Sequence, residues 1–194
     1  MSAGRIVLYG TTIVIALAVA IVFVWLPRST PLSEMGDGAP RPSAELLPFT
    51  WHQTPRDIPH VTFLAKDGAP VPIEKFRGRT RLVNLWATWC APCLREMPML
   101  DTLANATAGP KFEIIALNQD RGGLEAALPI WEEHAFTGLK LYLDDGLKTG
   151  RKLEARGLPL TVLIDAEGRE LGRLEGIATW DAPEVIAYFR TFAN

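Results

Sequence analysis

The 194-residue sequence contains only two cysteines, Cys90 and Cys93, and three histidines. So few cysteines exclude a scaffold stapled by several disulfides and a four-cysteine zinc site. The chain also lacks a strong charge of either sign, because 20 Lys and Arg oppose 22 Asp and Glu. This balance excludes nucleic-acid binding driven by bulk basicity. A hydrophobic content of 48% excludes a disordered chain, so at least one packed domain is expected.

The first long apolar run, residues 6–26, contains no charged side chain. As a helix rising about 1.5 Å per residue, it would span roughly the 30 Å of a bilayer core. A cleavable signal has a shorter apolar stretch followed by small residues, whereas this run ends in Phe23-Val24-Trp25-Leu26-Pro27. Residues 1–26 are therefore predicted to be an uncleaved transmembrane anchor, with a cleaved signal peptide as the alternative.

Two further segments follow the predicted anchor. Residues 27–48 are rich in Pro, Gly and Ser and are predicted to be a semi-extended linker. Residues 49–194 carry the patterns of a folded domain. The short tail before the anchor is expected to stay inside while the domain is exported. In a bacterium this arrangement gives a single-pass inner-membrane protein whose domain faces the periplasm.

Strand-like and helix-like periodicities alternate along residues 49–194. Strands are predicted at 61–64, 81–86, 112–117, 140–143, 161–164 and 170–174, and helices at 91–107, 124–134, 148–155 and 182–192. This order predicts an α/β fold in which helices cover both faces of a central mixed sheet.

The two cysteines lie in the segment Trp89-Cys90-Ala91-Pro92-Cys93, directly after a predicted buried strand and at the start of a predicted helix. Free backbone N–H groups at a helix N-terminus favour negative charge, so Cys90 is expected to be the low-pKa nucleophile. Cys93, one turn inside, is expected to resolve the mixed disulfide with a substrate. The alternatives are a static disulfide, a metal site and a copper-chaperone site. The histidines, which show no ligand spacing, are His52, His60 and His134.

The segment Val83-Asn84-Leu85-Trp86-Ala87-Thr88-Trp89-Cys90-Ala91-Pro92-Cys93-Leu94-Arg95-Glu96-Met97-Pro98 resembles the active-site segment of membrane-anchored bacterial thioredoxin-like proteins. These are the TlpA, ResA and CcmG types, and the TlpA type is the most similar. The resemblance extends from about residue 49 to the C-terminus and includes residues 157–165. It implies a thioredoxin-like fold with an N-terminal extension and, at residues 119–138 and the elements that follow, the β-α insertion of the TlpA type.

The resemblance also implies roles for residues around the cysteines. Pro159 matches the family's cis-proline, which faces the cysteine pair and exposes the backbone of Leu158 to an extended substrate. Glu96 matches an acidic residue that ResA types use, and is expected to accept a proton. The alternative is a solvated Glu in the first helical turn. Thioredoxin has a buried Asp where this chain has Asn84, and Asn takes no proton, which favours a role for Glu96.

Aromatic residues and the residues between the cysteines complete the predicted site. Trp86 and Trp89 are expected to pack around and shield the sulfurs, with substrate contact as the alternative. The predicted substrate-binding surface consists of Trp89, Ala91, Pro92 and Leu158. No metal and no cofactor other than the Cys90–Cys93 disulfide is expected.

By this resemblance the protein is expected to be a periplasmic protein-disulfide reductase. Its expected partners are disulfide-containing substrates: a copper chaperone or cytochrome oxidase subunit, which the TlpA likeness favours, or apocytochrome c. A membrane thiol reductase would donate the electrons, and no nucleic acid is expected to bind. A redox-inert, client-binding chaperone is the alternative from another class, and a peroxidase is disfavoured by the paired cysteine spacing.

Overall fold

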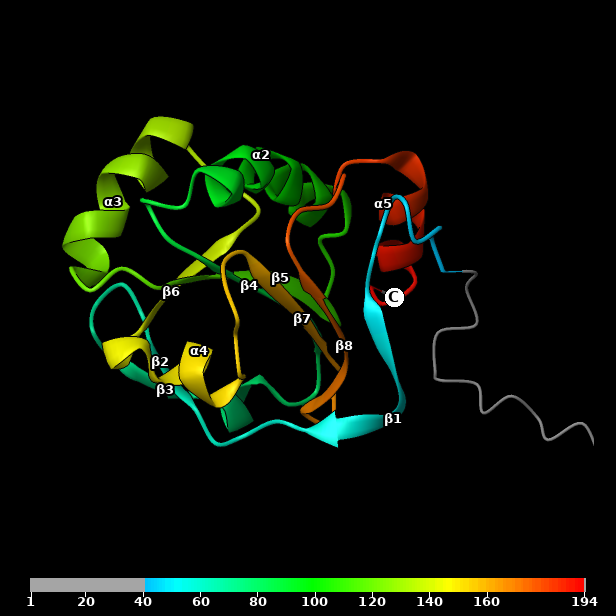
Figure 1. Ribbon diagram of the computed structural model, residues 1–194, viewed down its shortest axis with the longest axis horizontal. Coiled ribbons are helices and arrows are strands. Elements are labelled where there is room, and N and C mark those ends of the chain that lie inside the picture. The colour runs from blue at the N-terminus through cyan, green and yellow to red at the C-terminus, as the bar shows by residue number, and fades with distance from the viewer. Residues whose placement is uncertain (1–40, 194) are drawn as a thin grey trace, which may run out of the picture. The chain divides into compact units, whose positions relative to one another are not determined.

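The computed structural model describes residues 41–193, which contain one mixed β-sheet (Figure 1). The strands are β1 Thr50–Asp57, β2 Thr62–Leu64, β3 Pro70–Pro72, β4 Thr80–Trp86, β5 Phe112–Asn118, β6 Lys140–Asp144, β7 Leu160–Ile164 and β8 Arg169–Glu175. Their order in the sheet is β1-β8-β7-β4-β5-β6-β2-β3. β5 pairs in parallel with both β4 and β6, and the other pairs are antiparallel.

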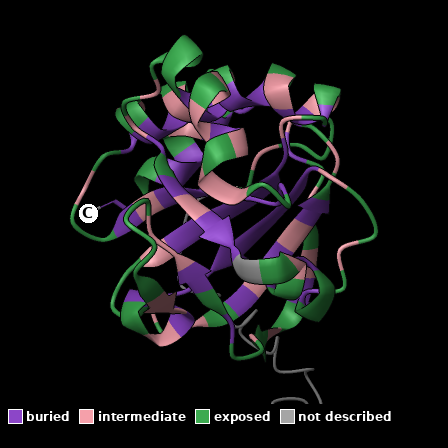
Figure 2. Ribbon diagram, turned by 90° about the vertical axis from the view of Figure 1, so that its left-hand side faces the viewer, coloured by how far each residue is buried: buried purple, intermediate pink, exposed green. Residues whose placement is uncertain are grey.

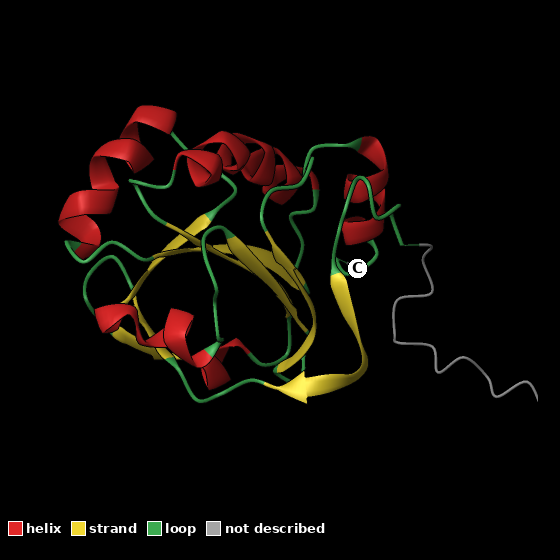
Figure 3. Ribbon diagram, viewed as in Figure 1, coloured by secondary structure: helices red, strands yellow, loops and turns green. Residues whose placement is uncertain are grey.

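Helices cover both faces of this sheet, as the sequence predicts (Figure 3). The α-helices are α2 Ala91–Ala106, α3 Gly123–His134, α4 Lys148–Lys152 and α5 Pro183–Arg190, and short 3₁₀ helices lie at Ile73–Phe76 and Asp145–Leu147. Buried residues of α2, α3 and α5 form one core with the sheet. A second core on the other face includes Phe76 and Leu153. Figure 2 shows buried residues concentrated on the strands and exposed residues along the outer sides of the helices.

The central strands are the elements that the sequence predicts best. All five residues of β7 are buried, as is nearly all of β4, because the sheet is covered on both faces. An apolar run of this kind needs no alternating pattern to be recognised. The predicted thioredoxin-like architecture is confirmed, with helix 148–155 ending earlier, at Lys152, and helix 182–192 spanning 183–190.

Two strands are absent from the sequence prediction. β1 is polar, contains Pro55, and pairs only with β8 at one edge of the sheet. Proline is tolerated at an edge because one side of the strand needs no ladder hydrogen bonds. β3 has only three residues, two of them proline, and is held by its hairpin with β2. Both strands depend on tertiary pairing that local patterns do not encode.

The predicted anchor, residues 1–26, and most of the predicted linker lie outside the described residues. Within the described linker residues 41–48, the N–H groups of Leu46 and Leu47 donate to the Ser43 carbonyl at 3.1 and 2.9 Å. Leu47 is 2% exposed and belongs to the core, so packed chain begins a few residues before Phe49. No helix within residues 41–193 is long and apolar enough to cross a membrane.

Asp101 ties helix α2 to the segment that leads into β6. Its Oδ1 accepts hydrogen bonds from the N–H groups of Thr137, Gly138 and Leu139, at 3.0, 2.8 and 3.1 Å. Asp101→Ala is expected to lower the free energy of unfolding by about 1–2 kcal/mol, because the three donors lose a charged acceptor. Denaturant unfolding measures this. A smaller loss in Asp101→Asn, which keeps Oδ1, is the control, and an unchanged Asp101→Ala midpoint would contradict the assignment.

Candidate active site

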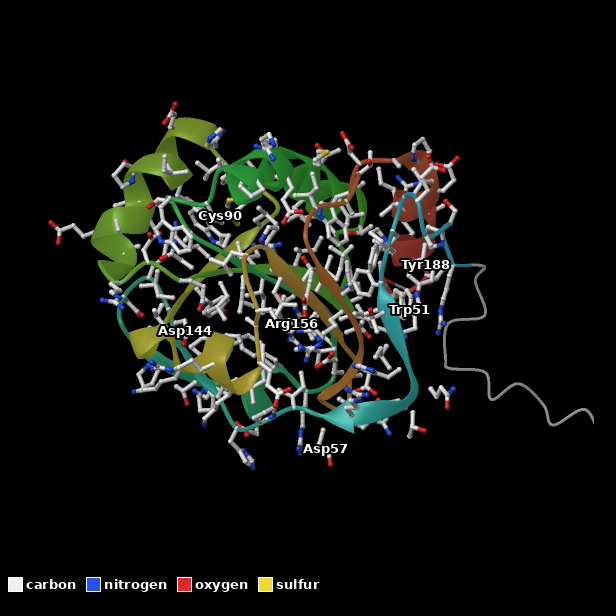
Figure 4. All side chains as sticks on the ribbon, in the orientation of Figure 1. Trp51, Asp57, Cys90, Asp144, Arg156 and Tyr188 are labelled. Atoms are coloured by element: carbon white, nitrogen blue, oxygen red, sulfur yellow. A yellow bond between two sulfur atoms is a disulfide. The ribbon has the colours of Figure 1, made fainter. Side chains whose placement is uncertain are left out.

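Cys90 lies between the end of β4 and the start of α2 (Figure 4). Cys90 is the N-cap of α2 and Cys93 lies in its first turn, with Pro92 between them at a position that needs no N–H donor. The Cys93 N–H donates to Cys90 Sγ at 3.3 Å, and the two sulfurs form a disulfide with a Cα–Cα distance of 5.2 Å. Cys90 therefore lies where backbone N–H groups stabilise a thiolate once the disulfide is reduced.

The two cysteines differ little in exposure but differ in position. Cys90 is 4% exposed, at the end of the helix, whereas Cys93 is 0% exposed and packs inside the core. This order agrees with a nucleophile at the surface side and a resolving thiol behind it.

Trp89 points away from the protein, contrary to the expectation that it packs around the sulfurs. It is 71% exposed, while Trp86, three residues earlier, is fully buried as expected. Trp89 follows the end of β4, where side chains no longer alternate into the sheet, so the sequence could not assign its side. An apolar side chain this exposed beside a disulfide fits the alternative role, contact with a substrate.

The segment after β8 is hydrogen-bonded to the residue that precedes β7, at the cis proline. The Leu158–Pro159 bond is cis, as the resemblance implies. The Gly176 N–H donates to the Pro159 carbonyl at 2.9 Å. The next residue, Ile177, is 48% exposed and is, with Trp89, one of two exposed large apolar side chains in the described chain. Leu158 is partly buried against the core cluster that contains both cysteines.

Glu96 is fully buried, which excludes the alternative of a solvated helix residue. Its Oε1 accepts a hydrogen bond from Asn84 Nδ2 at 2.7 Å, and its Oε2 accepts one from Trp180 Nε1 at 2.8 Å. Burial raises the pKa of this carboxyl from 4.5 to about 7. Hydrogen bonds from these two side chains and from the Ala178 N–H oppose part of that rise. Glu96 lies one helical turn after Cys93, on the same side of α2.

Asn84 links this carboxyl to the middle of the sheet. It lies opposite Thr161 in the β4–β7 pair, and its Nδ2 also donates to Thr161 Oγ1 at 2.9 Å. Asn84 Oδ1 is buried and accepts no hydrogen bond from the described residues. The ionisable group behind the cysteines is thus a helix carboxyl held by a strand amide.

Sequence reasoning missed two residues of this region, Trp180 and Asp120. Trp180 comes from the segment between β8 and α5, and no local pattern predicts its reach to Glu96. Asp120 accepts hydrogen bonds from the N–H and hydroxyl of Thr88, both at 2.9 Å. It could have been found, because β4 and β5 are adjacent parallel strands and residues just after each meet at one edge of the sheet.

A thioredoxin-like fold with a disulfide between the N-cap and the first turn of its leading helix defines a thiol–disulfide oxidoreductase. A family model described as Redoxin matches residues 53–182, and the chain belongs to this family. By its similarity to relatives named ResA and HelX, it is a thiol–disulfide oxidoreductase of that type.

The curated relatives carry corresponding names. The chain is 27% identical over 127 residues to the thiol-disulfide oxidoreductase ResA of Bacillus cereus, covering 66% of this chain and 72% of that protein. It is 35% identical over 104 residues to the thiol:disulfide interchange protein HelX of Rhodobacter capsulatus, covering 54% and 56%.

Solved structures share the fold. A solution structure of a thiol:disulfide interchange protein from Bacteroides sp. matches with a TM-score of 0.59 and 26% identity, over 73% of this chain and 90% of that one. A putative thiol:disulfide interchange protein DsbE from Chlorobium tepidum matches with a TM-score of 0.60 and 22% identity, over 70% and 96%, which supports the fold alone.

Proposed function

We propose that this protein is a membrane-anchored reductant of protein disulfides. The observation that carries the proposal is the Cys90–Cys93 disulfide at the start of α2, with Cys90 as the N-cap of this helix and the ionisable Glu96 buried one turn after Cys93. A thiolate held in this way attacks disulfides, and a second thiol three residues on releases the product.

The exchange balances over two steps. The Cys90 thiolate attacks one sulfur of a substrate disulfide, which breaks that bond, forms a mixed disulfide and releases the other substrate sulfur as a thiolate that takes up a proton. Cys93, deprotonated, then attacks Cys90 Sγ and forms the Cys90–Cys93 disulfide, and the second substrate sulfur leaves as a thiolate that takes up a proton. Two electrons pass from the pair to the substrate, and no metal or other cofactor takes part.

The surrounding residues supply a base and a docking surface in this proposal. Glu96 accepts the proton from Cys93, because its pKa near 7 lies close to the working pH. The Leu158 backbone beside the cis bond to Pro159 pairs with an extended substrate segment. Side chains that contact the substrate are Trp89, Ala91 and Pro92.

The proposed location follows from the N-terminal sequence. Residues 6–26 anchor the chain in the bacterial inner membrane, and residues 27–48 hold the domain on the periplasmic side. A reductant there needs electrons from inside the cell, so a membrane thiol reductase is its proposed donor.

Two client classes remain, each with its own support. The active-site segment is most similar to the TlpA type, which favours copper-handling proteins of cytochrome oxidase assembly, a copper chaperone or an oxidase subunit. The match to chains named ResA and HelX favours apocytochrome c, the client that the sequence resemblance gives to ResA and CcmG types.

The reduction potential of the Cys90–Cys93 pair tests the direction. Equilibration with glutathione buffers, followed by alkylation and mass measurement, is expected to give a potential below about −200 mV, toward the value of about −270 mV known for thioredoxin. A potential near −120 mV, typical of a strong periplasmic oxidant, would reverse the proposed direction. Glutathione alone titrates the pair, so the result is independent of client identity.

A further inference from the structure

The turn between β4 and α2 is hydrogen-bonded to the side chain of Asp120, which follows β5. The Cys90 N–H donates to the Ala87 carbonyl at 3.1 Å, so Thr88 and Trp89 are the two central residues of a tight turn. Asp120 Oδ2 accepts from the Thr88 N–H and Asp120 Oδ1 accepts from the Thr88 hydroxyl, both at 2.9 Å. One of the two central residues is thereby fixed through both its backbone and its side chain.

Asn118 in turn holds the Asp120 carboxylate through hydrogen bonds. Asn118 Nδ2 donates to Asp120 Oδ2 at 2.7 Å, and the Asp120 N–H donates back to Asn118 Oδ1 at 3.0 Å. Asp120 is 7% exposed and Asn118 is 1% exposed. The Gln119 N–H donates to the Trp86 carbonyl at 2.7 Å, which extends the pairing of β4 and β5 into the turn. Buried hydrogen bonds to an ionised group are short and strong, so Asp120 has little freedom to follow a moving turn.

We propose that Asp120 is a positioning residue for disulfide exchange, which fixes the turn at Thr88 so that Cys90 stays at the N-terminus of α2 and Trp89 stays exposed. Asp120 acts on the cysteine through Thr88, two residues earlier. The consequence lies in the reduced protein: a Cys90 thiolate held at the N-cap keeps the hydrogen bond from the Cys93 N–H, whereas one on a loose turn loses part of it. The role applies to exchange in either direction.

The sharpest test changes the hydroxyl and leaves every charge in place. Thr88→Val removes the side-chain donor at nearly constant volume, and Thr88→Ser keeps it. The buried carboxylates Asp120 and Glu96 are unchanged in both variants. Thr88→Val is expected to raise the pKa of the Cys90 thiol by about half a unit, which is about a threefold slower alkylation below that pKa. Thr88→Ser is expected to match the unmodified chain. The measurement is the pH dependence of iodoacetamide alkylation of reduced, full-length protein.

A second background shows whether Thr88 acts through Asp120. In Asp120→Ala the acceptor is gone, so adding Thr88→Val is expected to change the Cys90 pKa by less than about 0.1 unit relative to Asp120→Ala alone. Comparing the two proteins within this background removes the direct effect of the lost charge. A full half-unit rise in the Asp120→Ala background would show that Thr88 acts by another route and would overturn the proposal.

Asp101→Ala is the matched control, because Asp101 also fastens a loop through hydrogen bonds from backbone N–H groups, but it does so farther along α2. It is expected to lower stability without moving the Cys90 pKa. The proposal fails if Thr88→Val lowers stability yet leaves the pKa unchanged, since the contact is then only structural. It also fails if Asp101→Ala raises the pKa as much as Thr88→Val does.

Discussion

Cys90→Ser is expected to lower the rate of disulfide exchange at least about a thousandfold, because it removes the attacking thiolate. Cys93→Ser is expected to leave the first attack intact but stop the reaction at the mixed disulfide, because no second thiol can release the client. The measurement is reduction of a protein disulfide followed by thiol quantification, with the two single variants compared with the unmodified chain. Serine differs from cysteine in one side-chain atom, so neither change leaves a large cavity at the start of α2.

Two further measurements test the roles of the two cysteines. In the reduced protein Cys90 is expected to alkylate faster than Cys93 at mildly acidic pH, since Cys93 is fully buried. Full-length Cys93→Ser, expressed in the native cell, is expected to retain clients as disulfide-linked adducts. Adducts that contain copper-handling proteins support the first client class, and adducts that contain apocytochrome c support the second.

Three other outcomes bear on the roles assigned to the two cysteines. Faster alkylation of Cys93 would overturn the assignment of roles. Full activity of Cys90→Ser in cells would identify a redox-inert chaperone, because client binding alone does not require a sulfur at this position. Loss of activity in Cys90→Ser together with adducts in Cys93→Ser excludes that alternative.

The centre of the fold could be predicted because its signals are local. β4, β5 and β7 are apolar runs buried on both faces, and α2 follows β4 at the cysteine pair with helical spacing. The edges could not be predicted in this way. β1 has a polar sequence interrupted by Pro55, and it forms because β8 supplies a partner far along the chain. Edge strands depend on that partner more than on their own composition.

The active site, like the fold, has parts that the local sequence predicts and parts that it does not. The cysteine pair and the buried carboxyl can be located from motif and spacing, but the environment that sets their chemistry comes from other segments. Glu96 of α2 has a pKa of about 7 because its side chain is buried against Asn84 of β4 and Trp180 of the segment after β8. The orientation of Trp89 could not be predicted from the sequence, because residues in a turn have no periodicity that fixes which side they face.

The second large expected effect is the contribution of Glu96 to the pH dependence of the free energy of unfolding. Its pKa is 4.5 when exposed in the unfolded chain and about 7 when buried in the folded one. Between these values the folded state holds a proton that the unfolded state lacks. The stabilising contribution is therefore complete below pH 4.5 and is lost as pH rises through 7. The loss amounts to about 3 kcal/mol of unfolding free energy across this window.

Glu96→Gln is expected to abolish this part of the pH dependence, because the amide stays neutral. Gln at this position can accept from Trp180 Nε1 and donate to Asn84, whose amide turns over to present Oδ1. The Thr161 hydroxyl, which accepts from Asn84 Nδ2 in the unmodified chain, then donates to the same oxygen. The variant should match the oxidised unmodified protein near pH 4 and exceed its stability at pH 8.

Denaturant unfolding of the oxidised protein at a series of pH values measures this difference. Glu184→Gln, an exposed residue in the first turn of α5, is the control and should leave the pH dependence of stability unchanged. The pH profile of disulfide exchange in Glu96→Gln should also lack the ionisation near pH 7. The reason is that the Glu96 carboxyl, absent from this variant, is the proposed proton acceptor for Cys93. Parallel stability curves for Glu96→Gln and the unmodified chain would show that the buried carboxyl does not titrate in this range, and an unchanged rate profile would remove Glu96 from the exchange.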